Sequence, residues 1–255
     1  MSAAPKGRLY LVPAPLDFSC DQLAPLQDVM PLATIQVAAE LQHWICENAK
    51  STRAYLKRVS ELQPLKNQLQ ALQIQELPRE IHKKGDHTGN FDARPLLAAA
   101  LQGKDIGLVS EAGMPAIADP GSSVVRAAHD LGLQVVPLTG PMSLMLALAA
   151  SGLNGQNFAF AGYLPQDPAG RTQRIRELES VALKTGQSQI FIETPYRNAA
   201  LMQALLQTLQ GSTRLALSCG LTLGTAWNFS AVVSHWKKNK PVAPLNLPTV
   251  FCIGR

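Results

Sequence analysis

The sequence predicts an α/β protein with two α/β domains, the first built on a mostly parallel sheet and the second on a mixed sheet. In the first half, short apolar runs alternate with helical segments, which is typical of strands buried on both faces of a parallel sheet. Loops rich in glycine and proline separate these runs; the chain holds 18 of each residue. In the second half, runs containing Phe, Tyr and Ile follow shorter turns, which favours antiparallel pairing.

The first half contains four expected strands, at residues 8–13, 43–46, 106–110 and 133–138. A helix follows the second strand, with Asn48 or Ser51 as its N-cap. After the third strand, Asp119 and Pro120 have the spacing of an N-cap and the first helical residue. The helix that they begin is expected to end at Gly132. Residues 143–151 form another helix, which ends at Gly152, and the Gln-rich segment 63–75 is an exposed, partly helical connection.

The second half contains strand candidates at 158–164, 188–193, 214–219 and 249–255, with a helix at 198–209. We assign residues 1–130 to an N-terminal domain and residues 131–255 to a C-terminal domain.

Composition limits the class of protein. The 255 residues are 46% hydrophobic and only 5% aromatic. No apolar run reaches membrane-spanning length, and the first residues lack a signal-peptide pattern, so we expect a soluble, cytoplasmic protein with no membrane partner. The four cysteines form no C-x-x-C pair and are expected to be free thiols. The net charge of +5 permits an anionic partner such as RNA without requiring one. Basic residues gather at 50–66, 171–176 and 237–240, either as solvated faces or as phosphate contacts.

Three loops follow the carboxyl ends of the expected parallel strands, at 13–17, 47–50 and 110–121. In open α/β sheets, ligands bind beyond these strand ends. The last loop contains "EAGMPAIADPG", whose glycines and prolines allow the backbone to approach a ligand closely. We therefore expect one wall of a binding site there.

Four blocks occur in order along the chain: "LYLVPAPLD", "ENAKSTRAYLKR", "LVSEAGMPAIADPGSS" continuing to "GPMSLMLALAASGL", and "FIETPYR". Together they resemble the tetrapyrrole methylase superfamily of S-adenosylmethionine-dependent methyltransferases. Within it, the chain is similar to the branch of the ribosomal RNA small-subunit 2′-O-methyltransferase I group. Its "ENAKSTR" and "CGLT" segments resemble a shorter, mostly uncharacterised subgroup of that branch.

The resemblance implies a homodimer, with S-adenosylmethionine held without a metal in a cleft between the two domains. The loop at 13–16 would face the reaction zone. The residues that match cofactor-binding positions of the family are Pro13, Ala112, Gly113, Met114, Ile117, Met142, Ser143, Glu193 and Leu221.

The acceptor side departs from the family pattern. Glu47 matches the acidic residue of the family's E-D-T-R block and is the candidate general base, unless it only caps the following helix. Lys50 is the candidate for holding a phosphate or lowering the pKa of the acceptor. Where the family has R-E-L-T, this chain has Cys219, Gly220, Leu221 and Thr222.

Three functions stay open at this point. The first is a methyltransferase acting on ribosomal RNA or the small ribosomal subunit, at a ribose 2′-hydroxyl. The second is a methyltransferase of a small molecule such as a tetrapyrrole, and the third is a non-catalytic cofactor-binding or RNA-binding protein. A hydrolase that uses Glu111, Asp119 and His129 is disfavoured because Asp119 is the expected helix cap. His82 and His87 lack a third ligand at zinc spacing, so no metal is expected.

Overall fold

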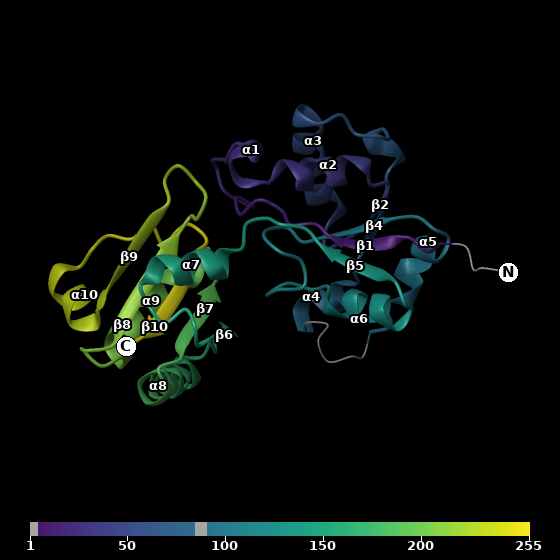
Figure 1. Ribbon diagram of the computed structural model, residues 1–255. Helices are drawn as coiled ribbons and strands as arrows, with labels where there is room; N and C mark the ends of the chain where they lie inside the picture. The colour runs from purple at the N-terminus through teal and green to yellow at the C-terminus, as the bar shows by residue number, and fades with distance from the viewer. Residues whose placement is uncertain (1–4, 85–90) are drawn as a thin grey trace. The chain divides into compact units, whose positions relative to one another are not determined.

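A computed structural model of the chain describes residues 5–84 and 91–255, with side chains for 5–81 and 91–255. The chain forms two compact units (Figure 1). The first unit comprises Met1–Ser19 and Ala24–Pro141, and the second comprises Cys20–Leu23 and Met142–Arg255.

The first unit is built on a sheet of five parallel strands in the order β3-β2-β4-β1-β5. The strands are β1 (Arg8–Leu11), β2 (His43–Cys46), β3 (Gln73–Glu76), β4 (Ile106–Val109) and β5 (Gln134–Pro137). Trp44 and Ile45 follow each other on β2 and are each 1% exposed. Because successive strand residues point to opposite faces, both faces of this sheet are covered. The predicted parallel sheet is confirmed.

Helices cover the two faces (Figure 1). The face that contains Trp44 packs against α1 (Leu26–Val29), α2 (Leu32–Glu40) and α3 (Ala49–Leu62). The opposite face packs against α5 (Ala98–Leu101) and α6 (Ser122–Asp130), and α4 (Arg79–Lys84) lies on the same side in Figure 1. Short 3-10 turns occupy Leu69–Ala71 and Arg94–Leu97. The Gln-rich segment therefore contains one 3-10 turn and an exposed edge strand, β3.

Two helix ends confirm the sequence prediction. The Asn48 side chain accepts hydrogen bonds from the backbone N–H groups of Lys50 and Ser51, at 2.9 and 3.3 Å, so Asn48 is the N-cap of α3. At the end of α6, Gly132 has φ +64°, and its N–H donates to the carbonyl of His129. The N–H of Leu133 donates to the carbonyl of Ala128, which completes a Schellman motif.

The predicted start of α6 is wrong. The helix begins at Ser122, and Gly121 occupies the N-cap position with φ +138°. Glycine adopts this conformation readily, whereas other residues do so at a cost. Because the chain turns at Gly121, Pro120 is not the first helical residue and Asp119 is not at the N-cap position.

The second unit contains a mixed sheet in the order β6-β7-β10-β8-β9. Its strands are β6 (Phe158–Tyr163), β7 (Ser188–Glu193), β8 (Arg214–Cys219), β9 (Trp227–Val232) and β10 (Thr249–Gly254). Only β6 and β7 pair in parallel, and the other pairs are antiparallel, as the sequence predicts. Helix α7 (Ser143–Ser151) packs on one face, and α8 (Pro168–Thr185), α9 (Pro195–Thr208) and α10 (Val233–Asn239) pack on the other.

Strand β5 lies in the range that we assigned to the C-terminal domain. It pairs with β1, with Leu9 opposite Val135, and so belongs to the first sheet. The first unit accordingly continues to Pro141. The assignment of two folding domains stays a prediction.

All four cysteines are free thiols. Cys46 is buried in the first sheet, Cys219 and Cys252 are buried in the second, and Cys20 is half-buried. Within the described residues, no helix is long and apolar enough to span a bilayer.

Candidate functional site

The loops after β1 and β4 are joined at the carboxyl edge of the first sheet. The N–H of Ala14 donates to the carbonyl of Gly113, and the N–H of Gly113 donates to the carbonyl of Ala14, both at 2.9 Å. These bonds hold the loop at 13–17 against the loop at 110–121.

The start of α3 contacts the same loop. The Ser51 hydroxyl donates to Glu111 Oε1 at 3.2 Å, which connects the segment after β2 to the segment after β4. From the end of β3, Glu76 Oε1 accepts the N–H of Ala49 at 2.6 Å. The three predicted loops therefore meet, and the end of β3 joins them.

The loop at 110–121 has a strained backbone. Gly113 and Gly121 have φ values of +71° and +138°, and Ala116 and Ala118 both have φ +65°. A left-handed conformation costs a residue with a Cβ roughly 1–2 kcal/mol. Such strain persists where the surroundings impose it, and it is concentrated at ligand-binding sites.

The loop at 13–17 is also held from the segment before α7. A Cβ added to Gly140 would lie 2.2 Å from Pro13 Cγ and 2.6 Å from Pro13 Cβ. The glycine is required here because the backbone lies directly on the proline ring. Pro13 is buried in the structure and lies against Gly140.

A cavity of about 370 Å³ opens at this edge, lined by Glu47, Asn48, Glu76, Leu77, Arg79 and Glu111. Three of these residues carry carboxylates. Since Asn48 caps α3, Glu47 is not the cap and its half-buried side chain is one wall of the cavity. Lys50 is exposed and does not line the cavity.

Asp119 lies close enough to two of these carboxylates to interact with them. Burial, followed by the charges of Glu47 and Glu111, raises the pKa of Asp119 to about 7. Since Gly121 holds the N-cap position of α6, the expectation that Asp119 is the cap residue does not argue against a carboxylate cluster. The cluster joins side chains from the ends of two neighbouring strands, β2 and β4.

The other predicted residues of the first unit lie in the loop that contains Gly113, which is hydrogen-bonded to Ala14. Ala112 and Met114 are half-buried on either side of the buried Gly113. Ile117 is 42% exposed, so a large apolar side chain faces outward from the strained loop.

In the second unit, four of the predicted cofactor-binding residues lie in two places, one at the start of α7 and the other at the end of β7. Met142 precedes α7 and Ser143 begins it, and Met142 packs with Leu221 against the apolar cluster beneath α7. Glu193 ends β7, opposite Thr249 of β10. Glu193 Oε1 accepts hydrogen bonds from the N–H of Thr194 and from Arg197 Nε and Nη2, at 2.7 to 2.9 Å.

The turn that replaces R-E-L-T has two left-handed residues. Gly220 has φ +60°, and a Cβ there would lie 2.8 Å from Leu247 Cδ1. Thr222 has φ +72°, and its buried hydroxyl has no hydrogen-bond partner among the described residues. A glutamate at position 220 would be strained at this φ and would require the Leu247 side chain to move.

Two charged residues at the cavity were missed from the sequence, Glu76 and Arg79. Both follow the Gln-rich segment, whose alternating polar residues hide a strand at the sheet edge. The sequence signal that indicates this strand is "QIQELP", in which the β-branched Ile74 lies in a short segment that ends at Pro78.

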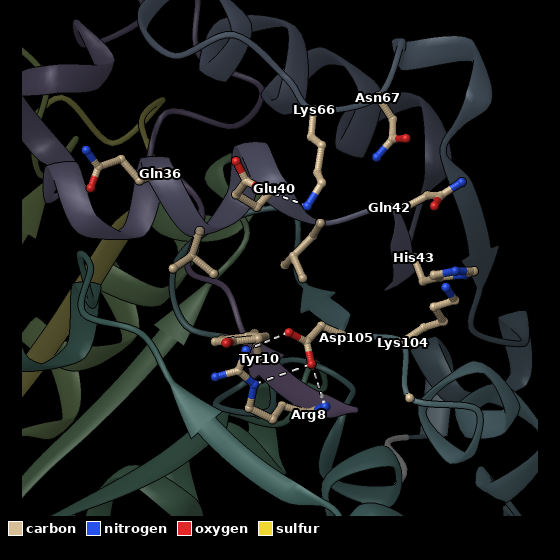
Figure 2. Close-up of a pocket in the computed structure, with 13 residues that line it drawn as sticks. Arg8, Tyr10, Gln36, Glu40, Gln42, His43, Lys66, Asn67, Lys104 and Asp105 are labelled. Atoms are coloured by element: carbon tan, nitrogen blue, oxygen red, sulfur yellow. Dashed lines mark hydrogen bonds and ion pairs between the residues drawn. The ribbon is translucent and has the colours of Figure 1, made fainter. Parts of the chain in front are cut away.

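A larger cavity, about 600 Å³, lies at the opposite edge of the first sheet, where β1 and β2 begin (Figure 2). Its main charges neutralise one another: Arg8 pairs with Asp105 at 2.8 Å and Lys66 with Glu40 at 3.0 Å. Burial, followed by the charge of Lys104, lowers the pKa of His43. Ligand sites of open α/β sheets lie at the other edge, so this cavity is not the candidate site.

Three other histidines were candidates from the sequence. His87 and the side chain of His82 lie outside the described residues, and His129 is in the last turn of α6. Among the residues that are described, no three His, Cys, Asp or Glu side chains are placed as metal ligands.

Comparison with known proteins gives one family. The family model of the tetrapyrrole (corrin/porphyrin) methylases matches residues 30–223. A ribosomal RNA small subunit methyltransferase I of Mesorhizobium japonicum is 33% identical over 215 residues, which are 84% of this chain and 63% of that protein. The chain spans between 46% and 66% of the length of the first three curated relatives that it matches.

Solved structures share the fold. A uroporphyrin-III-C-methyltransferase of Thermus thermophilus aligns with a TM-score of 0.55 at 18% identity, over 98% of this chain and 94% of that one. Another structure of a Thermus thermophilus uroporphyrin-III C-methyl transferase, complexed with S-adenyl homocysteine, aligns at 0.50 and 15% identity over 98% of both chains.

Proposed function

The chain belongs to the tetrapyrrole (corrin/porphyrin) methylase family, and we propose that it transfers a methyl group from S-adenosylmethionine to an RNA of the small ribosomal subunit. The observation that carries the proposal is the strained loop at 110–121, pinned at the carboxyl edge of a parallel sheet. This loop lies within the segment that the family model matches. The RNA acceptor is taken from the names of the relatives.

The pinned loop fits the proposed cofactor. Ala112, Gly113 and Met114 would lie against the adenosyl group, with backbone groups of Ala112 and Met114 contacting its polar edge. The exposed Ile117 would cover its apolar face. When bound, the cofactor supplies a methyl group that its sulfonium charge has already activated, so the protein has to align donor and acceptor. For Pro13, Met142, Ser143, Glu193 and Leu221, cofactor contact stays a prediction of the resemblance.

On the acceptor side, we assign the role of general base to Glu47. When the methyl group passes from the sulfonium sulfur to the acceptor oxygen and S-adenosylhomocysteine is left behind, the proton of the acceptor O–H group would pass to the Glu47 carboxylate. The exposed Lys50 would hold a phosphate of the acceptor.

The turn at 219–222 supports a second candidate function, a cofactor-binding or RNA-binding protein without turnover. There the family's acceptor-side pair is replaced by Cys219 and Gly220, and the left-handed φ of Gly220 disfavours a residue with a longer side chain. A small-molecule acceptor such as a tetrapyrrole is the remaining alternative. We also propose a homodimer and a cytoplasmic location, which rest on the resemblance and on the ribosomal names of the relatives.

Two measurements test the proposal in sequence. Calorimetry with S-adenosylhomocysteine, in the presence of a chelator, is expected to show binding; no heat at millimolar ligand would overturn the cofactor assignment. Mapping of methylated nucleotides in RNA from wild-type and deletion cells is then expected to reveal one missing methyl group. Cofactor binding with no difference in RNA favours the alternatives.

A further inference from the structure

Five basic residues lie on or just after α3: Lys50, Arg53, Lys57, Arg58 and Lys66. The structure divides them into two groups. Arg58 Nη1 and Nη2 each lie 3.0 Å from an oxygen of the buried Asp17 carboxylate, and Nη2 also donates to the carbonyl of Ala24 at 2.7 Å. Lys66 pairs with Glu40. These two cations have structural partners within the unit.

The other three share one exposed face of α3. Lys50, Arg53 and Lys57 are three and four residues apart, the spacing that places side chains on one side of a helix. We call them the α3 stripe. All three are exposed, and in the part of the chain that the structure describes, no ion pair joins them to a carboxylate. At a rise of about 1.5 Å per residue, the stripe extends over about 10 Å.

The stripe begins beside the candidate site. Helix α3 starts directly after Asn48, and both Asn48 and Glu47 line the cavity at the carboxyl edge of the sheet. The stripe therefore runs from the rim of the cavity along the outside of the first unit. A chain that enters the cavity at one residue would pass these three cations next.

The charge pattern identifies the class of partner. An uninterrupted row of cations without carboxylate partners suits a polyanion. A bilayer surface is disfavoured because an interfacial helix exposes its apolar face. The apolar face of α3, with Tyr55, Leu56 and Val59, is buried in the core instead.

We propose that the α3 stripe binds the phosphate backbone of single-stranded RNA next to the nucleotide that occupies the cavity. This inference rests on the proposed function, since it assumes that the acceptor is RNA. It assigns Arg53 and Lys57 to backbone contacts, which position the RNA without reading its sequence.

The test compares two double variants. Arg53→Gln with Lys57→Gln removes two charges from the stripe, and Lys237→Gln with Lys238→Gln removes two exposed charges from α10. Affinity for labelled oligouridylate is measured over a series of KCl concentrations. Each lost phosphate contact lowers the slope of log affinity against log salt by about 0.7 for single strands, so the stripe variant is expected to lose about 1.4. The α10 variant is expected to keep the wild-type slope.

The outcomes separate the inference from the proposed function. If the wild-type protein neither binds oligouridylate in a salt-dependent way nor methylates RNA, the proposed function fails. If the wild type does both and the stripe variant keeps its slope, the inference fails. The inference also fails if the slope of the α10 variant falls by as much as that of the stripe variant. Binding of both variants to phosphatidylserine vesicles is measured as well, and the inference fails if the stripe variant loses vesicle binding but keeps its affinity for oligouridylate. Unchanged affinity for S-adenosylhomocysteine in both variants shows that the substitutions have not disturbed the cofactor site.

Discussion

Ala14 and Gly113 form a two-hydrogen-bond bridge between loops that follow different strands of the first sheet. Gly113 has φ +71° in this bridge. A Cβ added to Gly113 would lie 3.4 Å from Leu16 Cδ2, which is an ordinary van der Waals distance. The cost of Gly113→Ala is therefore conformational, roughly 1–2 kcal/mol. We expect a lower melting temperature and weaker S-adenosylhomocysteine binding, measured by thermal unfolding and calorimetry. Gly155→Ala, at a site with no atom within 4 Å of the new Cβ, is the control. Unchanged binding in Gly113→Ala would mean that the loop is not part of the cofactor site.

The contact between Gly140 and Pro13 predicts a steric effect. Gly140→Ala would place a methyl group within 2.2 Å of Pro13 Cγ, so the two segments must separate. Overpacking of this kind costs about 1–3 kcal/mol. We expect a clear fall in melting temperature, with Gly224→Ala as the control because no atom lies within 4 Å of its new Cβ. A variant as stable as the wild type would show that the two loops are not locked together.

Asp119 predicts a pH dependence of stability. Its pKa is about 7 in the folded protein against an ordinary value of 3.8, so between these values the folded state keeps a proton that the unfolded state has lost. The free energy of unfolding therefore falls as pH rises through this window. Asp119→Asn cannot ionise and is expected to gain stability relative to the wild type from pH 4 to pH 8, which thermal unfolding across that range measures.

For the same titration, Asp21→Asn changes an exposed carboxyl and serves as the control. A gap between Asp119→Asn and the wild type that stays constant with pH would refute the shifted pKa.

Glu47→Gln separates a catalytic role from a structural one. Because Asn48 already caps α3, the variant is expected to lose little stability and to keep its affinity for S-adenosylhomocysteine. The single-turnover rate is expected to fall about a hundredfold or more, the typical loss when a general base is removed. Glu76→Gln makes the same change in the same cavity and retains an oxygen for the N–H of Ala49, so it should react almost normally. Equal rates for Glu47→Gln and the wild type would place the base elsewhere.

Much of the fold could be predicted because its central strands are locally distinctive. Strand β2 occupies 43–46 as expected, since an aromatic and a β-branched residue form a short apolar run between polar residues. Helix α7 occupies 143–151 and ends at Gly152 with φ +69°. By contrast, the edge strands β3 and β9 were missed because one or both of their faces stay partly exposed and the apolar signal is weak.

The site was harder to predict because it depends on contacts between distant segments. The sequence placed Glu47 and Glu111 after separate strands, but their proximity requires β2 and β4 to be neighbours in the sheet. The misplaced start of α6 has a local cause. Ala116 and Ala118 adopt a backbone conformation that alanine rarely takes, so only Gly121 signalled the turn.

Each unit contains buried cysteines whose reactivity can be used to follow the opening of that unit. A thiol enclosed in the core reacts with an alkylating reagent only after its surroundings open. Cys46 therefore reports opening of the first sheet, whereas Cys219 and Cys252 report opening of the second. Pulsed alkylation in increasing urea, followed by mass spectrometry of the labelled peptides, would give the order in which the two sheets open. If Cys46 and Cys252 become reactive at the same urea concentration, the two units unfold cooperatively. If they do not, the unit whose cysteine reacts at the lower urea concentration is the less stable one.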